Sequence, residues 1–341
     1  MQLQLGTDQK AWNAALKGVS GWYFTHCFEW GDILAAEGKL VERLVFTQDK
    51  QLIALAQLVY QRLPFGWSYA FCPRGPVFVS AEHEASQRER VYSVFCDYLR
   101  KKGILFFRFE PKANSFLPAR DARLIKANDV NPRATTLIDL GLSTDLLLER
   151  MHSKTRYNIR LAEKKNIQIT EEKNLELFLQ LSQTTAERDG FRLHERAHYE
   201  QVLGSAFARQ LIARVKNTPI ATVVLVDFGD TMTYLYGASD YRYRALMAPY
   251  LLQWEAIQAA KTLGYRYYDF FGIAPQADQP QAEKKEEDER AYDPKHQYAG
   301  VTRFKLGFGG RAWEAPGTYD LILTPGKYRM YQLLRVIRRW F

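Results

Sequence analysis

The sequence predicts a mixed α/β fold with two domains of similar architecture, and three observations support this prediction. The chain has 341 residues, which is enough for two domains of ordinary size. Apolar residues make up 47% and charged residues 25%, a balance typical of globular proteins. The expected order of a hairpin, a strand, a helix and another strand occurs twice, about 165 residues apart, as a repeat of architecture and not of sequence.

The first half is expected to hold short helices, a hairpin and one long helix between strands. Val91, Phe95 and Leu99 recur at intervals of four and support the long helix, which Gly103 should end. The expected elements are helices over residues 8–18 and 28–37, a hairpin of 43–47 with 52–60, strands over 68–71 and 77–79, a helix over 82–102 and a strand over 104–109.

The second half is expected to repeat this order after a strongly basic helical stretch over residues 142–166. The domain boundary is expected near residues 140–143. The polar residues 275–299 predict a long exposed loop. The expected elements are a helix over 175–190, a hairpin of 210–216 with 220–227, a strand over 231–237, a helix over 247–263, and strands over 265–271 and 313–322.

Composition excludes several classes of protein. Three cysteines without zinc-ligand spacing argue against a disulfide framework or a zinc site. The sequence has no HExxH pair, no GxSxG elbow, no apolar signal core at its start and no apolar run of ~18 residues. We therefore expect a cytoplasmic protein that needs no metal or cofactor. The formal charge of +9 indicates phosphate-bearing partners, namely nucleic acid, nucleotides or anionic lipid.

A row of basic residues is expected on one face of the helix within residues 142–166. Arg156, Arg160 and Lys164 follow at intervals of four, and Lys154 lies on an adjacent face. Like charges at this spacing repel unless an anion offsets them, so the row fits a phosphate backbone. The alternative is a solvated helix face with Glu163 as a partial counter-charge.

Residues 300–310, GVTRFKLGFGG, combine four glycines with one lysine between aromatic residues. Lys305 is a candidate contact for a phosphate or an oxyanion in a partly dry site, and Arg303 and Phe304 stand beside it. The order of residues does not match a phosphate loop. The alternative is a glycine-rich turn before a strand.

Other candidates stand at the ends of expected strands, and each has a structural alternative. Tyr236 precedes a helix whose first turn contains Tyr250, and both tyrosines fit either a site or the core. Asp269 fits a site carboxylate or a turn cap. Glu110 fits a site or surface charge at a strand end, and the loop from Arg192 to Arg196 fits a phosphate contact or an ordinary polar loop.

Three segments in order resemble the FemX/FemA/MurM family of peptidoglycan bridge-forming aminoacyltransferases. They are KTRYNIR at 154–160, YGAS at 236–239 with APY at 248–250, and DFFGI at 269–273 with GVTRFKLGFGG at 300–310. The resemblance covers essentially the whole chain and implies two GNAT-type domains, here 1–141 and 142–317. It also implies that the tail, residues 318–341, returns to the first domain. No long helical pair follows residue 190, so we expect the type without a coiled-coil arm.

The resemblance implies that an aminoacyl-tRNA donates its amino acid to the stem-peptide amine of a precursor, either UDP-MurNAc-pentapeptide or lipid II. The ester is already activated, so orientation and charge stabilisation supply the rate. Lys305 would hold the terminal phosphates and the oxyanion, and Phe304 beside it would pack at the site. Tyr250 would lie near both substrates, and Glu110, where the family has Asp, would orient or deprotonate the amine. Arg192, Arg196, Tyr236, Asp269 and Arg303 would bind substrate. Lys154, Arg156, Arg160 and Lys164 would bind tRNA.

One departure from the family pattern and two other function classes remain. No lysine follows Trp30 where a FemX-like enzyme binds diphosphate, so the acceptor is held differently or is lipid-linked. An acyl-CoA-dependent GNAT enzyme is the first alternative, although the sequence has no pyrophosphate loop of that type. A non-catalytic RNA-binding or membrane-surface protein is the second.

The basic, amphipathic tail over 325–341 lies either on anionic lipid at the inner face of the membrane or on the first domain with its arginines outward. A monomer is expected.

Overall fold

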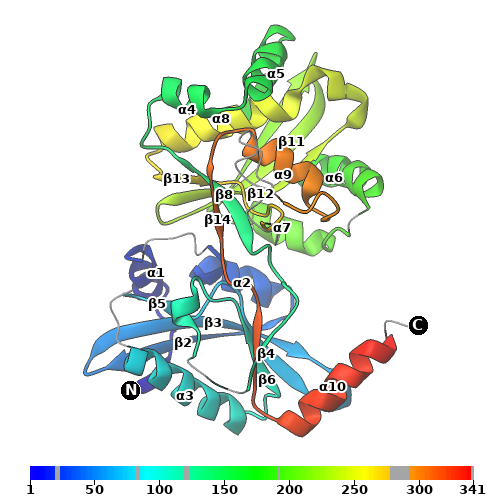
Figure 1. Cartoon of the computed structure of the whole chain (residues 1–341). Helices are drawn as coiled ribbons and strands as arrows, with labels where there is room; N and C mark the ends of the chain where they lie inside the picture. Colours follow the sequence, from blue (N-terminus) through cyan, green and yellow to red (C-terminus); the bar gives the residue numbers. More distant parts are fainter. Residues whose placement is uncertain are drawn as a thin grey trace, which may run out of the picture. The chain divides into compact units, whose positions relative to one another are not determined.

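The computed structural model describes residues 1–19, 24–80, 85–118, 121, 123–190, 192–276 and 292–338. The chain forms two compact units (Figure 1). Unit 1 comprises Met1–Asn131 together with Ala315–Phe341, and unit 2 comprises Pro132–Glu314. The boundary expected near residues 140–143 lies later than this division, because the strand before it, β8, pairs with β13 and β14 inside unit 2.

Unit 1 is built on a mixed sheet with the strand order β1-β2-β3-β4-β6-β15-β7, and β5 pairs with β3 outside this path. Its strands are β1 (Gln2–Leu5), β2 (Leu40–Gln48), β3 (Gln51–Arg62), β4 (Ser68–Cys72), β5 (Val77–Phe78), β6 (Phe106–Phe109), β7 (Leu124–Lys126) and β15 (Tyr319–Ile322). Its helices are α1 (Gln9–Lys17), α2 (Phe28–Ala36), α3 (Ala85–Lys101) and α10 (Pro325–Arg338), with short 3₁₀ turns η1 (Phe24–His26), η2 (Pro64–Gly66) and η3 (Asn114–Phe116).

Helix α3 makes the crossover that the parallel pair β4 and β6 requires. Its apolar face packs on the sheet, where the ring of Phe95 meets that of Phe107 edge-on at 4.3 Å between centroids. These contacts follow from the spacing of four read in the sequence, and the helix expected there is confirmed for the described residues, 85–101.

Unit 2 repeats this arrangement with the strand order β14-β8-β13-β12-β11-β10-β9. Its strands are β8 (Ala134–Asp139), β9 (Gln168–Glu171), β10 (Ala208–Val215), β11 (Thr218–Phe228), β12 (Thr231–Ser239), β13 (Tyr267–Asp269) and β14 (Arg311–Glu314). Its helices are α4 (Thr144–Arg150), α5 (Ser153–Lys164), α6 (Leu175–Asp189), α7 (Arg196–Gly204), α8 (Ala248–Thr262) and α9 (Ala299–Leu306), with a 3₁₀ turn η4 (Tyr241–Leu246). Helix α8 is the crossover between the parallel strands β12 and β13, as α3 is between β4 and β6, so the repeated order is confirmed.

Three local expectations are wrong. The basic stretch over 142–166 is not one helix, because Met151 is extended and His152 caps a second helix, α5. The strand expected over 313–322 is two strands in different units, since β14 pairs with β8 and β15 pairs with β6 and β7. The turn expected at the start of 300–310 is helix α9. Most of the expected loop over 275–299 lies outside the described residues.

Among the described helices, none combines the length and the apolar composition that a bilayer-spanning segment requires.

Candidate functional site

Lys305 lies on α9 and its side chain is turned into unit 2, with 7% of its surface exposed. Its Nζ donates to the backbone oxygen of Gly272 at 2.8 Å and to that of Phe271. An ammonium group has three donors. The described residues accept two of them, which leaves one for an oxygen of a ligand.

The two carbonyls that hold Lys305 belong to a turn directly after β13. Phe271 and Gly272 both have left-handed backbone angles, with φ of 44° and 66°. A Cβ atom on Gly272 would lie 3.1 Å from Cγ of Pro132 and 4.0 Å from Nζ of Lys305. Glycine is therefore needed here both for its backbone angle and for the space beside the lysine.

Asp269, the last residue of β13, holds the same turn from its other side. It is 1% exposed, and its Oδ1 accepts from the backbone N–H of Phe271 at 2.9 Å and from the hydroxyl of Thr135 on β8. Of the two interpretations of Asp269, the turn cap is therefore the one its contacts describe.

Burial lowers the pKa of Lys305 to about 7, and the negative charge of Asp269 opposes this shift. The ring of Tyr234 also faces the ammonium, with 5.2 Å between Nζ and the ring centroid. A lysine of this pKa is protonated in about half of the molecules at neutral pH. The amine can therefore act as a cation for phosphate or an oxyanion, or accept a proton, at physiological pH.

An aromatic cluster surrounds Phe304, the residue before Lys305 on α9. Tyr250, in the first turn of α8, meets the ring of Phe304 edge-on at 5.0 Å and stacks on Phe308 at 6.1 Å. Phe308 also contacts the buried Phe270 at 5.1 Å. The structure thus packs Tyr250 against Phe304, two residues that the sequence analysis selected, and Phe304 directly precedes Lys305 on α9.

The glycines that follow α9 serve packing. A Cβ atom on Gly309 would lie 2.2 Å from the backbone oxygen of Arg150, and one on Gly307 would lie 2.5 Å from Oγ1 of Thr155. The backbone oxygen of Gly307 also accepts from His152 N at 2.9 Å. The glycine-rich segment therefore fastens α9 to the junction of α4 and α5, and it joins the segments that carry the resemblance.

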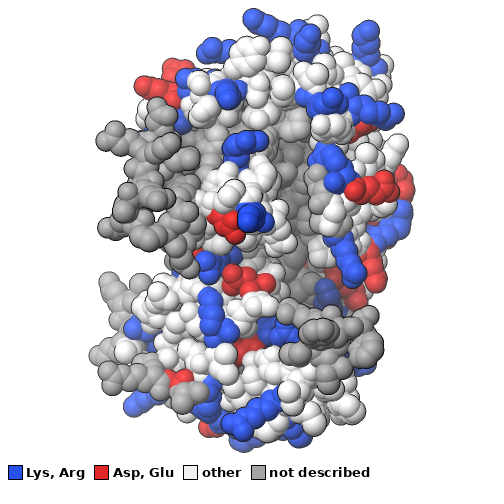
Figure 2. All heavy atoms as spheres, turned by 45° about the vertical axis from the view of Figure 1, so that its right-hand side comes forward, with Lys and Arg blue, Asp and Glu red and all other residues white. Residues whose placement is uncertain are grey.

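The basic helix α5 exposes Lys154, Arg160 and Lys164 to solvent. Figure 2 shows Lys and Arg side chains gathered at the end of unit 2 where α5 lies in Figure 1. Arg156 differs from these three: its Nη1 donates to the backbone oxygens of Glu149 at 3.1 Å, Leu148 and Met151. Its guanidinium caps the end of α4, so the expected row of cations keeps two of its three members.

Tyr236 lies on β12 in a cluster of aromatic and histidine rings. Its hydroxyl forms a 2.7 Å hydrogen bond with Nε2 of His198, and its ring meets that of Tyr199 edge-on at 5.3 Å. His194 lies against the same group, with its ring 4.3 Å from that of His198. This cluster was not foreseen, because its members come from β12, α7 and the loop before α7.

The remaining arginines selected in unit 2 are exposed. Arg192 lies in the loop before α7, Arg303 lies on the solvent side of α9, and Arg196 begins α7. Arg196 forms a two-point ion pair with Glu176 of α6, one contact of which is 3.0 Å. An exposed ion pair of this kind is weak and can exchange for a phosphate.

Glu110 lies in unit 1, where four donors surround its carboxylate. Its Oε1 accepts from Asn131 N at 2.9 Å and from Thr318 Oγ1 at 3.1 Å. Its Oε2 accepts from Asn131 Nδ2 at 2.8 Å and from Arg74 N at 3.2 Å. Glu110 is 4% exposed, so its contacts are those of a buried clamp, and a surface charge at a strand end is excluded.

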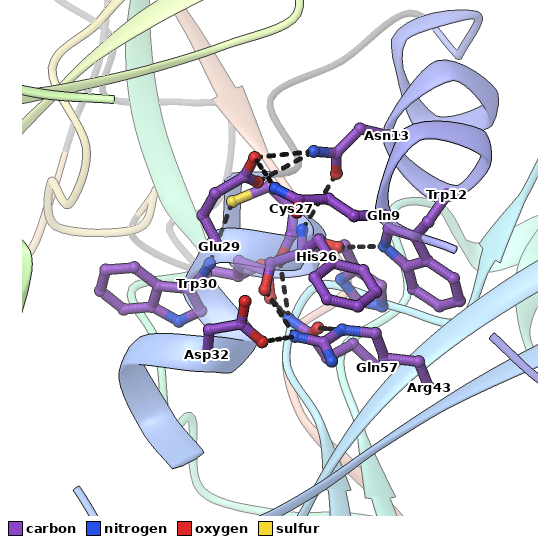
Figure 3. A network of polar contacts seen from close by, with 12 residues as sticks. Gln9, Trp12, Asn13, His26, Cys27, Glu29, Trp30, Asp32, Arg43 and Gln57 are labelled. Carbon is purple, nitrogen blue, oxygen red and sulfur yellow. Dashed lines mark hydrogen bonds and ion pairs between the residues drawn. The ribbon is translucent and has the colours of Figure 1, made fainter. Parts of the chain in front are cut away.

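The segment before Trp30 is held by side chains from α1 and from the hairpin of β2 and β3 (Figure 3). Gln57 donates to the backbone oxygens of Thr25 at 2.9 Å and Cys27 at 3.2 Å. Trp12 donates to the backbone oxygen of His26 at 2.7 Å. Every one of these bonds fixes the entry to α2.

Arg43 is the arginine of this network, and its Nε and Nη2 both donate hydrogen bonds (Figure 3). It donates to Gln57 at 2.8 Å, to the backbone oxygen of Phe28 and to Asp32 at 2.7 Å. Its guanidinium also lies 3.5 Å from the ring centroid of Phe28. Arg43 thus supports α2 and does not replace a diphosphate-binding lysine.

Sequence reasoning missed Thr135 and Tyr234, which contact Asp269 and Lys305. A threonine in a strand and a tyrosine in a strand carry no distinctive signal, because both are common there. Among the described residues, no group of three or more acidic, histidine or cysteine side chains could hold a metal ion.

The chain matches the model of the FemAB family over residues 17–130, 122–210 and 204–335. It is 18% identical over 388 residues to the lipid II:glycine glycyltransferase of Staphylococcus epidermidis, covering 90% of this chain and 89% of the relative. A crystal structure of FemX superposes with a TM-score of 0.77 at 17% identity, over 97% of this chain and 99% of FemX. A tandem GNAT protein from clavulanic acid biosynthesis gives 0.53 at 9% identity, over 95% and 99%. The expected fold of two GNAT-like domains is confirmed.

Proposed function

The chain belongs to the FemAB family, and on that premise we propose that it transfers an amino acid from an aminoacyl-tRNA to a peptidoglycan precursor. The acceptor is the side-chain amine of the stem peptide, in UDP-MurNAc-pentapeptide or lipid II, and the product builds a cross-bridge. The relatives named for glycyl transfer to lipid II support this class of reaction.

The reaction forms one amide bond and breaks one ester bond. The amine nitrogen attacks the aminoacyl carbonyl carbon, the C–O bond to the terminal ribose breaks, and the ribose oxygen leaves with the proton that the amine loses. The ester is already activated, so the enzyme needs neither a covalent intermediate nor a metal-bound nucleophile. Placing the two substrates and stabilising the oxyanion supplies the rate.

The observation that carries the proposal is the buried ammonium of Lys305, which has two backbone carbonyls behind it and a donor left for a ligand. We assign Lys305 to the terminal phosphates and the developing oxyanion. We assign Phe304 and Tyr250, whose rings pack edge-on, to an apolar wall of the same site. The low dielectric strengthens the attraction between ammonium and oxyanion.

The exposed cations of α5, Lys154, Arg160 and Lys164, are the proposed contacts of the tRNA backbone. The proposed contacts of the precursor are Arg192, Arg196 and Tyr236 on β12. Arg303 is the proposed contact of the donor end. Glu110 stays a proposal as the residue that orients the acceptor amine, through the Asn131 and Thr318 groups it holds.

The test is transfer from a charged tRNA to purified UDP-MurNAc-pentapeptide or lipid II, followed by mass spectrometry of the product. Lys305→Ala should reduce the transfer rate about 10²–10³-fold, as expected for losing one oxyanion contact. Lys101→Ala, at an exposed lysine of α3, is the matched control and should keep the wild-type rate. Transfer from acyl-CoA without tRNA, or product formation after ribonuclease treatment of the donor, would favour the acyl-CoA-dependent alternative.

A further inference from the structure

Helix α10 packs one face firmly on unit 1. The rings of Tyr328 and Tyr331 lie 5.2 and 5.3 Å from that of Phe106 on β6. The hydroxyl of Tyr328 donates to Asp320 at 2.9 Å, and Asp320 forms a buried ion pair with Arg108 at 2.7 Å. The inner face of the helix is therefore occupied, and α10 packs beside β4 and β6 (Figure 1).

The outer face of α10 is apolar as well. Leu333 is 66% exposed and Met330 is 45% exposed, at helical angles opposite those of Tyr331 and Tyr328. Lys327 and Arg329 are exposed on either side of them. The expectation of a tail packed with its arginines outward therefore describes this face incompletely. The outward face also presents large apolar side chains, and nothing in the described chain covers them.

The tip of the β3–β4 hairpin adds a second exposed apolar element to this end of unit 1. Leu63 and Trp67 pack against the same cluster as Tyr328 and Tyr331, which fixes the tip beside α10. Phe65, between them, is 71% exposed and has a left-handed φ of 62°. A bulky residue in this conformation is strained, so the fold holds an aromatic side chain in water at a local cost.

The charge around these apolar groups is positive. Arg62 is exposed at the base of the tip, and residues 62–69 and 325–335 contain three arginines and one lysine but no aspartate or glutamate. Apolar side chains ringed by cations fit the surface of an anionic bilayer, where the former enter the acyl boundary and the latter contact lipid phosphates. A second copy of this chain fits poorly, because it would set one positive surface against another.

We propose that the hairpin tip and the outer face of α10 form one docking surface for an anionic lipid bilayer. It attaches unit 1 reversibly, with Phe65, Met330 and Leu333 inserted and Arg62, Lys327 and Arg329 on the headgroups. The proposal deepens the proposed function, since a lipid-linked acceptor would be met at that surface. Binding itself requires no transfer reaction.

The experiment is sedimentation of the full chain with large vesicles of phosphatidylglycerol and phosphatidylcholine, compared with vesicles of phosphatidylcholine alone. The chain should sediment with the anionic vesicles and be released in part at high salt. Phe65→Ser with Leu333→Ser should weaken binding about tenfold or more, since two large apolar groups are lost. The matched control, Leu5→Ser with Leu263→Ser, removes two leucines elsewhere that are also more than half exposed, and should bind as wild type.

Lys327→Gln with Arg329→Gln should weaken binding and flatten its salt dependence, whereas Lys101→Gln with Lys216→Gln should do neither. Circular dichroism checks that every variant is folded. Failure of the wild-type chain to bind anionic vesicles, or an equal loss in the control pairs, would overturn the proposal. So would a stable dimer in sedimentation velocity that Phe65→Ser with Leu333→Ser abolishes, because the face would then join two copies. A chain that binds vesicles but transfers no amino acid would refute only the proposed reaction.

Discussion

Asp269 and Lys305 hold the same two-residue turn from opposite sides. Asp269 accepts from the N–H of Phe271 at 2.9 Å, while Lys305 donates to the oxygens of Phe271 and Gly272. The carboxylate and the ammonium thus bind neighbouring groups of the same backbone turn. The position of the lysine therefore depends on a residue that need not touch any substrate.

This relationship predicts that Asp269→Asn lowers the pKa of Lys305 while the lysine side chain itself is retained. The amide oxygen keeps the bond to Phe271, but the loss of charge removes the interaction that opposes the lowered pKa of Lys305. The pKa of the lysine should fall further below 7, and the affinity for charged tRNA at pH 7 should drop several-fold. Binding measured from pH 5.5 to 8.5 should show a midpoint moved toward acid, and an unmoved midpoint would contradict this role.

Thr135 provides the control for that experiment. Thr135→Ser keeps the hydroxyl that donates to Asp269 and should preserve both affinity and midpoint. Thr135→Val removes the donor at nearly constant volume and should act in the same direction as Asp269→Asn. Equal behaviour of the serine and valine variants would show that only packing is involved.

The buried lysine should also make the stability of the chain depend on pH. The pKa of Lys305 is about 7 in the folded chain and near 10.5 when unfolded, so between these values the unfolded chain binds more protons. The free energy of unfolding should therefore rise with pH across this window, relative to Lys305→Met, by on the order of 1 kcal/mol per pH unit. Urea unfolding of both proteins at pH 7, 8 and 9 measures this difference, and a constant difference would show that the lysine titrates normally.

Gly272 can be tested against a glycine that shares only its backbone angle. Gly272→Ala places a methyl group 3.1 Å from Pro132 and beside Lys305, whereas Gly264→Ala, at φ of 86°, meets nothing within 4 Å. Both should lose about 1 kcal/mol of stability from strain. Only Gly272→Ala should also lower the transfer rate, by about tenfold or more, because a shift of the turn moves the ammonium. Similar rates in the two variants would mean that the turn tolerates displacement.

Much of the fold was predictable from the sequence because each strand and helix carries its own apolar period. The spacing of four between Val91, Phe95 and Leu99, for example, predicts α3 without any knowledge of the sheet on which it packs. The helix α9 was missed, since Gly300 and the glycines after Leu306 weaken any local helical signal. Its stability comes from tertiary contacts, such as the approach of Gly309 to Arg150, that no local pattern records.

The candidate site was predictable only in part. Lys305 and Tyr250 were candidates from the residue pattern, and the resemblance then gave them and Phe304 roles; the contact between Tyr250 and Phe304 is what the structure adds. The role of Arg156 could not be read from the spacing that it shares with Arg160, because its guanidinium turns back to the end of α4 only once the chain bends at Met151. Whether the guanidinium of Arg156 donates to backbone carbonyls therefore depends on that bend and not on the charge pattern.

Arg156 and Arg160 should consequently separate stability from RNA binding. Arg156→Gln removes the cap on α4 and should lower the free energy of unfolding by about 1–2 kcal/mol. Arg160→Gln, on the exposed face of α5, should leave stability within about 0.5 kcal/mol. It should instead weaken tRNA binding. The slope of log affinity against log salt should decrease by the contribution of about one phosphate contact. Thermal unfolding and a salt titration of tRNA binding measure the two effects, and a larger loss of stability in Arg160→Gln would reverse the assignment.

Glu110 offers the sharpest division between a structural and a chemical role in unit 1. Glu110→Gln replaces one oxygen by an NH₂ group facing donors from Asn131, Arg74 or Thr318, so at least one buried donor loses its acceptor. The free energy of unfolding should fall by about 1–3 kcal/mol. Thr318→Val removes one partner of the same carboxylate without changing its charge, and serves as the comparison. Both rates are measured well below the melting temperature. If Glu110→Gln is destabilised but transfers at the rate of Thr318→Val, Glu110 has a structural role only. A further loss of 10²-fold or more in kcat, with KM unchanged, would instead identify Glu110 as the group that orients or deprotonates the amine.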